Sequence, residues 1–98
     1  MAYADEADLL NVALFGFTAN QWREANPELA KKNNVRDFAT INELTVLSNL
    51  ETHNAEFIKE GKMKADRFQI LVKIAQYQLS ILDEAEKMRR QNNLPEMK

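Results

Sequence analysis

The side chains of this sequence that could bind a metal ion centre on one histidine. His53, the only histidine, stands three residues before Glu56 and seven before Glu60, so the three share one face if the segment is helical. Imidazole and carboxylate groups are zinc ligands, but a zinc site needs at least three, and the chain has no cysteine and no second histidine. Surface residues at this spacing are common on helices. We interpret His53 as a solvated or helix-packing residue, and we predict no metal site and no cofactor.

The parts of the common catalytic arrangements are also missing. Nucleophilic catalysis needs an activated serine, cysteine or similar group. The two serines, Ser48 and Ser80, lie inside segments with helical spacing and in no G-x-S-x-G turn. The two glycines, Gly16 and Gly61, stand too far apart to form a loop that binds phosphate. The sequence therefore predicts a protein that is not an enzyme.

Composition predicts one globular domain built from helices. The 98 residues suffice for a single core, and 45% hydrophobic with 29% charged residues is typical of folded proteins. Only two glycines and two prolines are present, which argues against an all-β fold with its many turns. No apolar run is long enough to cross a bilayer, and the first residues lack a signal-peptide pattern. We therefore expect a cytoplasmic protein without membrane contact.

The charges are unevenly distributed along the chain, although the net charge is only −2. Residues 1–61 carry five basic and ten acidic side chains, whereas residues 62–98 carry eight and five. Neither part has the density of lysine and arginine that binding to a phosphate backbone requires. The opposite signs favour contact between the two parts, either within the chain or between chains.

Two long helices are predicted to position the other residues. Thr40 and Glu43 form a T-x-x-E capping box and Gly61 can adopt the left-handed conformation that ends a helix, which predicts a helix over residues 41–60. A second helical pattern covers residues 65–91. Short helices are expected within residues 5–33, a connector at 34–40 and a disordered tail at 92–98. We predict an all-α bundle of four to five helices, in which two long antiparallel helices are capped by the short N-terminal ones.

The last helix is predicted to carry more apolar surface than one neighbouring helix can cover. It has two apolar seams, and the second consists of Ile70, Ile74, Tyr77, Ile81 and Met88. A helix of about 27 residues is about 40 Å long, whereas a domain of this size has a diameter of about 26 Å. We predict that the second seam is a self-association face and favour a dimer. The alternative is a tail that becomes disordered after about residue 86.

Several short runs of residues carry a resemblance to a known family. They are YAxEADLLN (3–11), ALFG (13–16), TA (18–19), QWR (21–23), NxRDxAT (34–40) and LSNLExxNA (47–55). As a set, they resemble the C-terminal region of bacterial and phage KilA-N domain proteins, over residues 3–82. The resemblance implies a phage-related regulator in which a separate KilA-N module binds DNA, and that module is absent from this sequence. It implies a context and no particular chemistry.

Six polar residues that match this family pattern are predicted to hold the connector against the first long helix. They are Arg23, Arg36, Asp37, Asn49, Glu51 and Asn54. We expect partly buried hydrogen bonds and ion pairs among them, which fix geometry more than they add stability. On this hypothesis the substitution Asp37→Ala leaves Arg36 without a partner and lowers the melting temperature.

Together these observations favour a non-catalytic interaction or oligomerisation module of a KilA-N-type regulator. Its expected partner is a second copy of the chain or another protein. DNA is expected to be contacted only through a separate KilA-N module. The alternative function is direct nucleic-acid binding by this chain.

Overall fold

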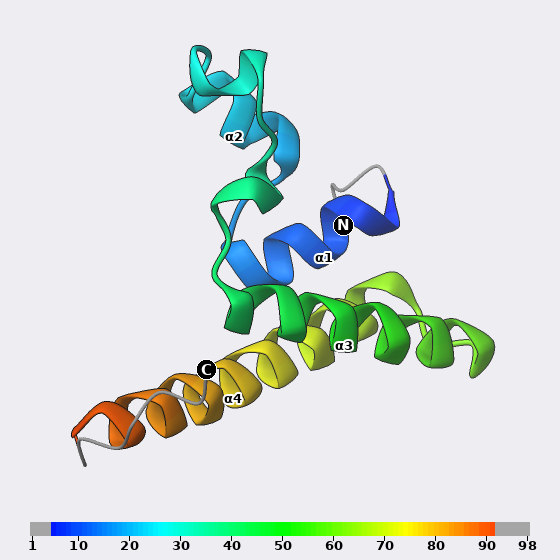
Figure 1. Ribbon diagram of the computed structural model, residues 1–98. Coiled ribbons are helices and arrows are strands. Elements are labelled where there is room, and N and C mark those ends of the chain that lie inside the picture. The colour runs from blue at the N-terminus through cyan, green and yellow to red at the C-terminus, as the bar shows by residue number, and fades with distance from the viewer. Residues whose placement is uncertain (1–4, 92–98) are drawn as a thin grey trace.

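The computed structural model describes residues 5–91, and that range contains helices and turns but no strand (Figure 1). In chain order the elements are α1 (Glu6–Phe15), α2 (Ala19–Ala25), the 3₁₀ turns η1 (Leu29–Lys31) and η2 (Val35–Phe38), α3 (Ile41–Lys59) and α4 (Lys64–Gln91). The predicted all-α class is confirmed.

The two long helices lie where the sequence patterns predict them. The helix expected over residues 41–60 is α3, and the helix expected over residues 65–91 is α4. The expected short helices within residues 5–33 correspond to α1, α2 and η1, and the connector at 34–40 contains η2. Because α4 continues to Gln91, a tail that starts after residue 86 is not observed. The expected disordered tail, residues 92–98, lies outside the described residues.

Local hydrogen bonds determine where α3 begins and ends. The Thr40 hydroxyl accepts the Glu43 N–H at 3.0 Å, and the Glu43 carboxylate accepts the Thr40 N–H at 2.8 Å. At the other end Gly61 has a φ of +80°, which a residue with a side chain rarely adopts. Its N–H donates to the carbonyl of Ile58, and the next N–H, of Lys62, donates to Phe57. This pattern satisfies the last carbonyls of the helix and turns the chain towards α4.

Three helices, α1, α3 and α4, share one hydrophobic core. Figure 1 shows α3 and α4 running antiparallel beside each other and α1 lying across them. The core side chains are Leu9, Leu10 and Ala13 of α1, Val46, Leu47 and Leu50 of α3, and Leu71 and Ala75 of α4. Within each helix they recur every one to four residues, so each helix contributes one continuous apolar face.

The segment from α2 through η2, residues 19–38, projects from this body (Figure 1), and we call it the arm. Neither α2 nor η1 contains a buried residue. Within the arm, Trp22 of α2 packs against Phe38 of η2 with ring centroids 5.7 Å apart. The prediction that the short helices cap the long pair is therefore correct for α1 and wrong for α2 and η1. The physical reason is that α2 has one large apolar side chain, too few to form an apolar face.

The substitution Thr40→Ala should lower the free energy of unfolding by about 1 kcal/mol, because it removes the hydroxyl that caps α3. Urea unfolding followed by circular dichroism measures the change. Thr18→Ala is the matched control, since Thr18 forms the same capping box with Gln21 at the start of α2. Because α2 contributes no residue to the core, the control should cost much less. Equal losses would contradict this description by showing that the arm and the body unfold as one unit.

Candidate interaction surface

The six polar residues predicted to form one network lie in separate places. Arg36 of η2 pairs with Glu51 of α3 at 3.5 Å, and both side chains are half exposed. Asp37 instead caps η2, where its carboxylate accepts the Asn34 N–H at 2.8 Å. The expectation that Asp37→Ala strands Arg36 is therefore wrong, because the partner of Arg36 is Glu51.

The remaining members of the predicted network face other directions. Asn49 donates from α3 to the Gln78 side chain of α4 at 3.0 Å. Among residues 5–91, no ion pair or hydrogen bond involves the Arg23 side chain, which lies on the projecting arm and is exposed. The predicted network is divided because successive residues of α3 point about 100° apart, so Asn49 and Glu51 face different neighbours.

The polar cluster that the structure does bury joins α1, α3 and α4. Arg67 of α4 donates through Nη1 to Glu6 Oε1 of α1 at 2.6 Å and to Asn54 Oδ1 of α3 at 2.8 Å. Its Nη2 reaches Glu6 Oε2 at 3.3 Å, and its Nε donates to the carbonyl of Lys62 at 3.2 Å. Asn54 completes the cluster by donating to Glu6 Oε1 at 2.9 Å. The Arg67 side chain is only 8% exposed, so its charge depends on these partners.

This buried cluster is electrostatically matched. The hydrogen bonds from Arg67, and then from Asn54, lower the pKa of Glu6 below its ordinary value. Among the described residues, every buried side-chain nitrogen or oxygen has a hydrogen-bond partner. Of the three residues, only Asn54 is among those predicted from the sequence to form a polar network. A signal for Arg67 was present, because it stands four residues before Leu71 and eight before Ala75, on the apolar face of its helix.

The two apolar seams of α4 point in different directions. The seam with Leu71 and Ala75 fills the core. The other seam faces outward, and we call it the α4 stripe; it consists of Ile70, Ile74, Tyr77, Ile81 and Met88. Ile70 and Ile74 are half-buried, while Tyr77 is 68%, Ile81 47% and Met88 51% exposed. Of the residues predicted as a self-association face, Tyr77, Ile81 and Met88 are therefore left exposed by the rest of the described chain, whereas Ile74 packs against the core.

The α4 stripe runs beside α3. A hollow of about 170 Å³ opens on the surface between the two helices there, lined by Thr45 and Asn49 of α3 and by Gln78, Ile81 and Leu82 of α4. None of these side chains is charged, so the border of the stripe next to α3 offers no like charge that would repel a partner helix. The polarity of this border is compatible with a second helix.

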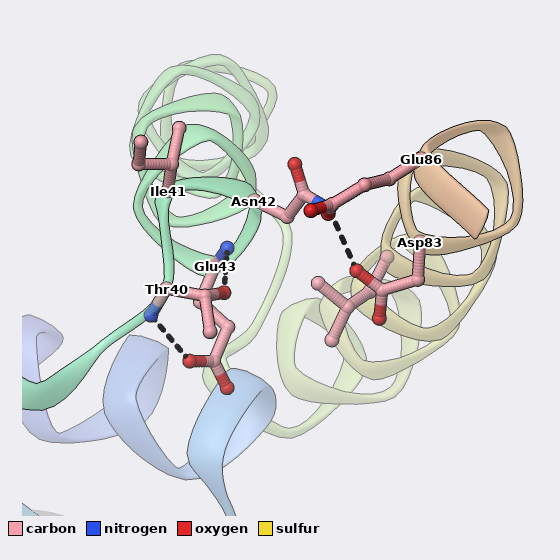
Figure 2. Close-up of a pocket in the computed structure, with 7 residues that line it drawn as sticks. Thr40, Ile41, Asn42, Glu43, Asp83 and Glu86 are labelled. Carbon is pink, nitrogen blue, oxygen red and sulfur yellow. Dashed lines mark hydrogen bonds between the residues drawn. The ribbon is translucent and has the colours of Figure 1, made fainter. Parts of the chain in front are cut away.

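A second hollow, of about 280 Å³, lies at the start of α3 (Figure 2). Figure 2 shows Asn42 turned towards α4, where its amide donates to Asp83 at 2.7 Å and to Glu86 at 3.3 Å. These acidic side chains are engaged in the contact between α3 and α4. Within residues 5–91, no group of three or more histidine, cysteine or acidic residues is arranged to hold a metal ion.

The other candidate residues lie in ordinary surroundings. His53 is half-buried on α3 and stacks on Phe57 with ring centroids 6.1 Å apart, as expected of a helix-packing residue. Among the described helices, none combines the length and apolarity needed to span a bilayer. A scan against protein-family models and searches among curated proteins and solved structures find no significant match. The resemblance to KilA-N proteins therefore stays a prediction.

The substitution Arg67→Ala should destabilise the fold by about 1–3 kcal/mol, because it leaves the buried Asn54 oxygen without its donor, whereas the Glu6 carboxylate, 43% exposed, can be hydrated. Urea unfolding monitored by circular dichroism gives the free energy. Arg36→Ala is the control, since the Arg36–Glu51 pair is half exposed and should contribute less than about 1 kcal/mol. Similar losses for the two variants would contradict the structural role assigned to the buried cluster.

Glu6 should also make the stability depend on pH. Because its pKa is lower in the folded chain than in the unfolded chain, its contribution is complete above the unfolded pKa and is lost as the pH falls through the folded pKa. The substitution Glu6→Gln should therefore destabilise the protein at neutral pH, and this effect should shrink as the pH falls through the folded pKa of Glu6; because the side chain is 43% exposed, solvent screening keeps the effect modest. Unfolding midpoints of both proteins from neutral to acidic pH test the prediction. Glu56→Gln, at an exposed residue without an ion pair among residues 5–91, should shift the midpoint little at any pH.

Proposed function

We propose that this chain is a non-catalytic interaction module that associates with itself through the α4 stripe. The observation that carries the proposal is the exposure of Tyr77, Ile81 and Met88 on the outer side of the longest helix, in line with Ile70 and Ile74. Contiguous exposed apolar side chains on one helix are typical of a protein–protein contact, whereas isolated ones are not.

The fold supports a contact between molecules that are already folded. The buried core of α1, α3 and α4 contains no stripe residue, although Ile74 packs against its edge, so a single chain has its own hydrophobic core. The stripe residues stand four, three, four and seven positions apart, which is close to the 3.5-residue repeat of helices that pack along their length. The partner surface that suits such a stripe is therefore another helix.

The resemblance to KilA-N proteins supplies the proposed biological setting. In that setting the module brings together copies of a phage-related regulator, or a regulator and another protein, and a separate KilA-N module contacts DNA. Direct nucleic-acid binding by this chain is the weaker alternative. The basic side chains of the arm alternate with acidic ones, and Lys31 pairs with Glu28 at 3.1 Å, so the arm does not form a continuous basic surface.

The substitution Tyr77→Lys should weaken self-association at least about tenfold, because it places a charge in the middle of the apolar contact. Sedimentation equilibrium at several protein concentrations measures the dissociation constant. Ile41→Lys is the matched control, because Ile41 is 81% exposed and points away from α4 (Figure 2). The control should associate like the unmodified chain. If the unmodified chain is a strict monomer at the highest concentration, the proposed function is wrong.

A further inference from the structure

We infer that the partner of the α4 stripe is a second copy lying antiparallel, so that Lys73 of each copy pairs with the partner's Glu84. This inference rests on the proposed function and adds the orientation and the register of the contact. It begins from the symmetry of the stripe, whose centre is at Leu79. Tyr77 and Ile81 are equally distant from that centre, and so are Ile70 and Met88.

A two-fold rotation about an axis through this centre brings the stripe onto itself in the reverse direction. Tyr77 then lies opposite the partner's Ile81, and Ile70 lies opposite the partner's Met88. Every large side chain at the middle and ends of the stripe meets another apolar side chain. One position breaks the symmetry, because the residue that corresponds to Ile74 is Glu84.

Glu84 is therefore the residue that decides the orientation. It is exposed and, among residues 5–91, belongs to no ion pair, and the same is true of Lys73. The two are eleven residues apart, so they lie within about 20° of each other around the helix axis, on the same border of the stripe. In the antiparallel register the partner's Glu84 falls within one residue, about 1.5 Å along the axis, of Lys73.

The parallel arrangement offers no such pairing. A two-fold axis parallel to the helices places the border that carries Lys73 and Glu84 against the opposite border of the partner helix, so the two charges do not meet. Facing opposite charges select the orientation of paired helices. The antiparallel arrangement therefore gains two attractive pairs that the parallel arrangement lacks.

The size of the stripe predicts a dimer that dissociates on dilution. From Ile70 to Met88 the stripe is about 27 Å long, and a helix is about 10 Å wide, so the contact area is well below that of a standard stable interface. Because each chain has its own hydrophobic core, the subunits should stay folded when the dimer dissociates. The stripe is thus exposed in the monomer and covered in the dimer.

Charge reversal tests the pairing. Lys73→Glu and Glu84→Lys should each raise the dissociation constant about fivefold or more, because each turns both attractive pairs into repulsive ones. The double variant should restore the constant of the unmodified chain. Lys32→Glu, a reversal at an exposed lysine on the arm, is the control and should change nothing. Circular dichroism melts confirm that each variant folds.

Cysteine cross-linking tests the orientation directly, because the chain has no cysteine of its own. Chains with Lys73→Cys and chains with Glu84→Cys are mixed in equal amounts in a glutathione redox buffer. The antiparallel dimer predicts mixed disulfides between the two kinds of chain. Disulfides between two Lys73→Cys chains would overturn the antiparallel inference and leave self-association intact, whereas a chain that stays monomeric would overturn both proposals.

Discussion

The arrangement of the three body helices depends on the buried contact of Arg67 with Glu6 and Asn54. Each partner comes from a different helix, and the guanidinium group also binds the carbonyl of Lys62 in the turn between α3 and α4. A planar group with several donors satisfies all of these acceptors only in one relative position of the helices. Because an unpaired charge would be costly at this depth, the contact excludes other registers of α1 and α4.

This constraint has a consequence for the outer surface of α4. Once Arg67 faces inward, Leu71 and Ala75 follow it into the core, since they lie one and two turns further along the same face. The seam that includes Tyr77 and Ile81 must then face outward beside α3. The exposed stripe is thus a result of how the core is built, and it provides the surface on which the proposed association depends.

The arm shows a different balance of forces. Trp22 and Phe38 contact each other, and Arg36 links the arm to Glu51 of α3 by a half-exposed ion pair. An exposed pair of this kind contributes little. Val35 of η2 is buried, but it does not belong to the core cluster of α1, α3 and α4. That cluster therefore contains no residue of the arm.

The sequence by itself determined the parts of this protein that rest on local interactions. The capping box at Thr40, the left-handed Gly61 and the apolar spacing of the long helices place α3 and α4, because each signal acts between residues only a few positions apart. Tertiary structure alone decided the rest. It pairs Glu6 with residues 48 and 61 positions away, divides the expected polar network and selects which seam of α4 is buried. Local patterns carry no record of such distant partners, since a polar residue has the same helical spacing whether it meets water, an arginine or a second chain.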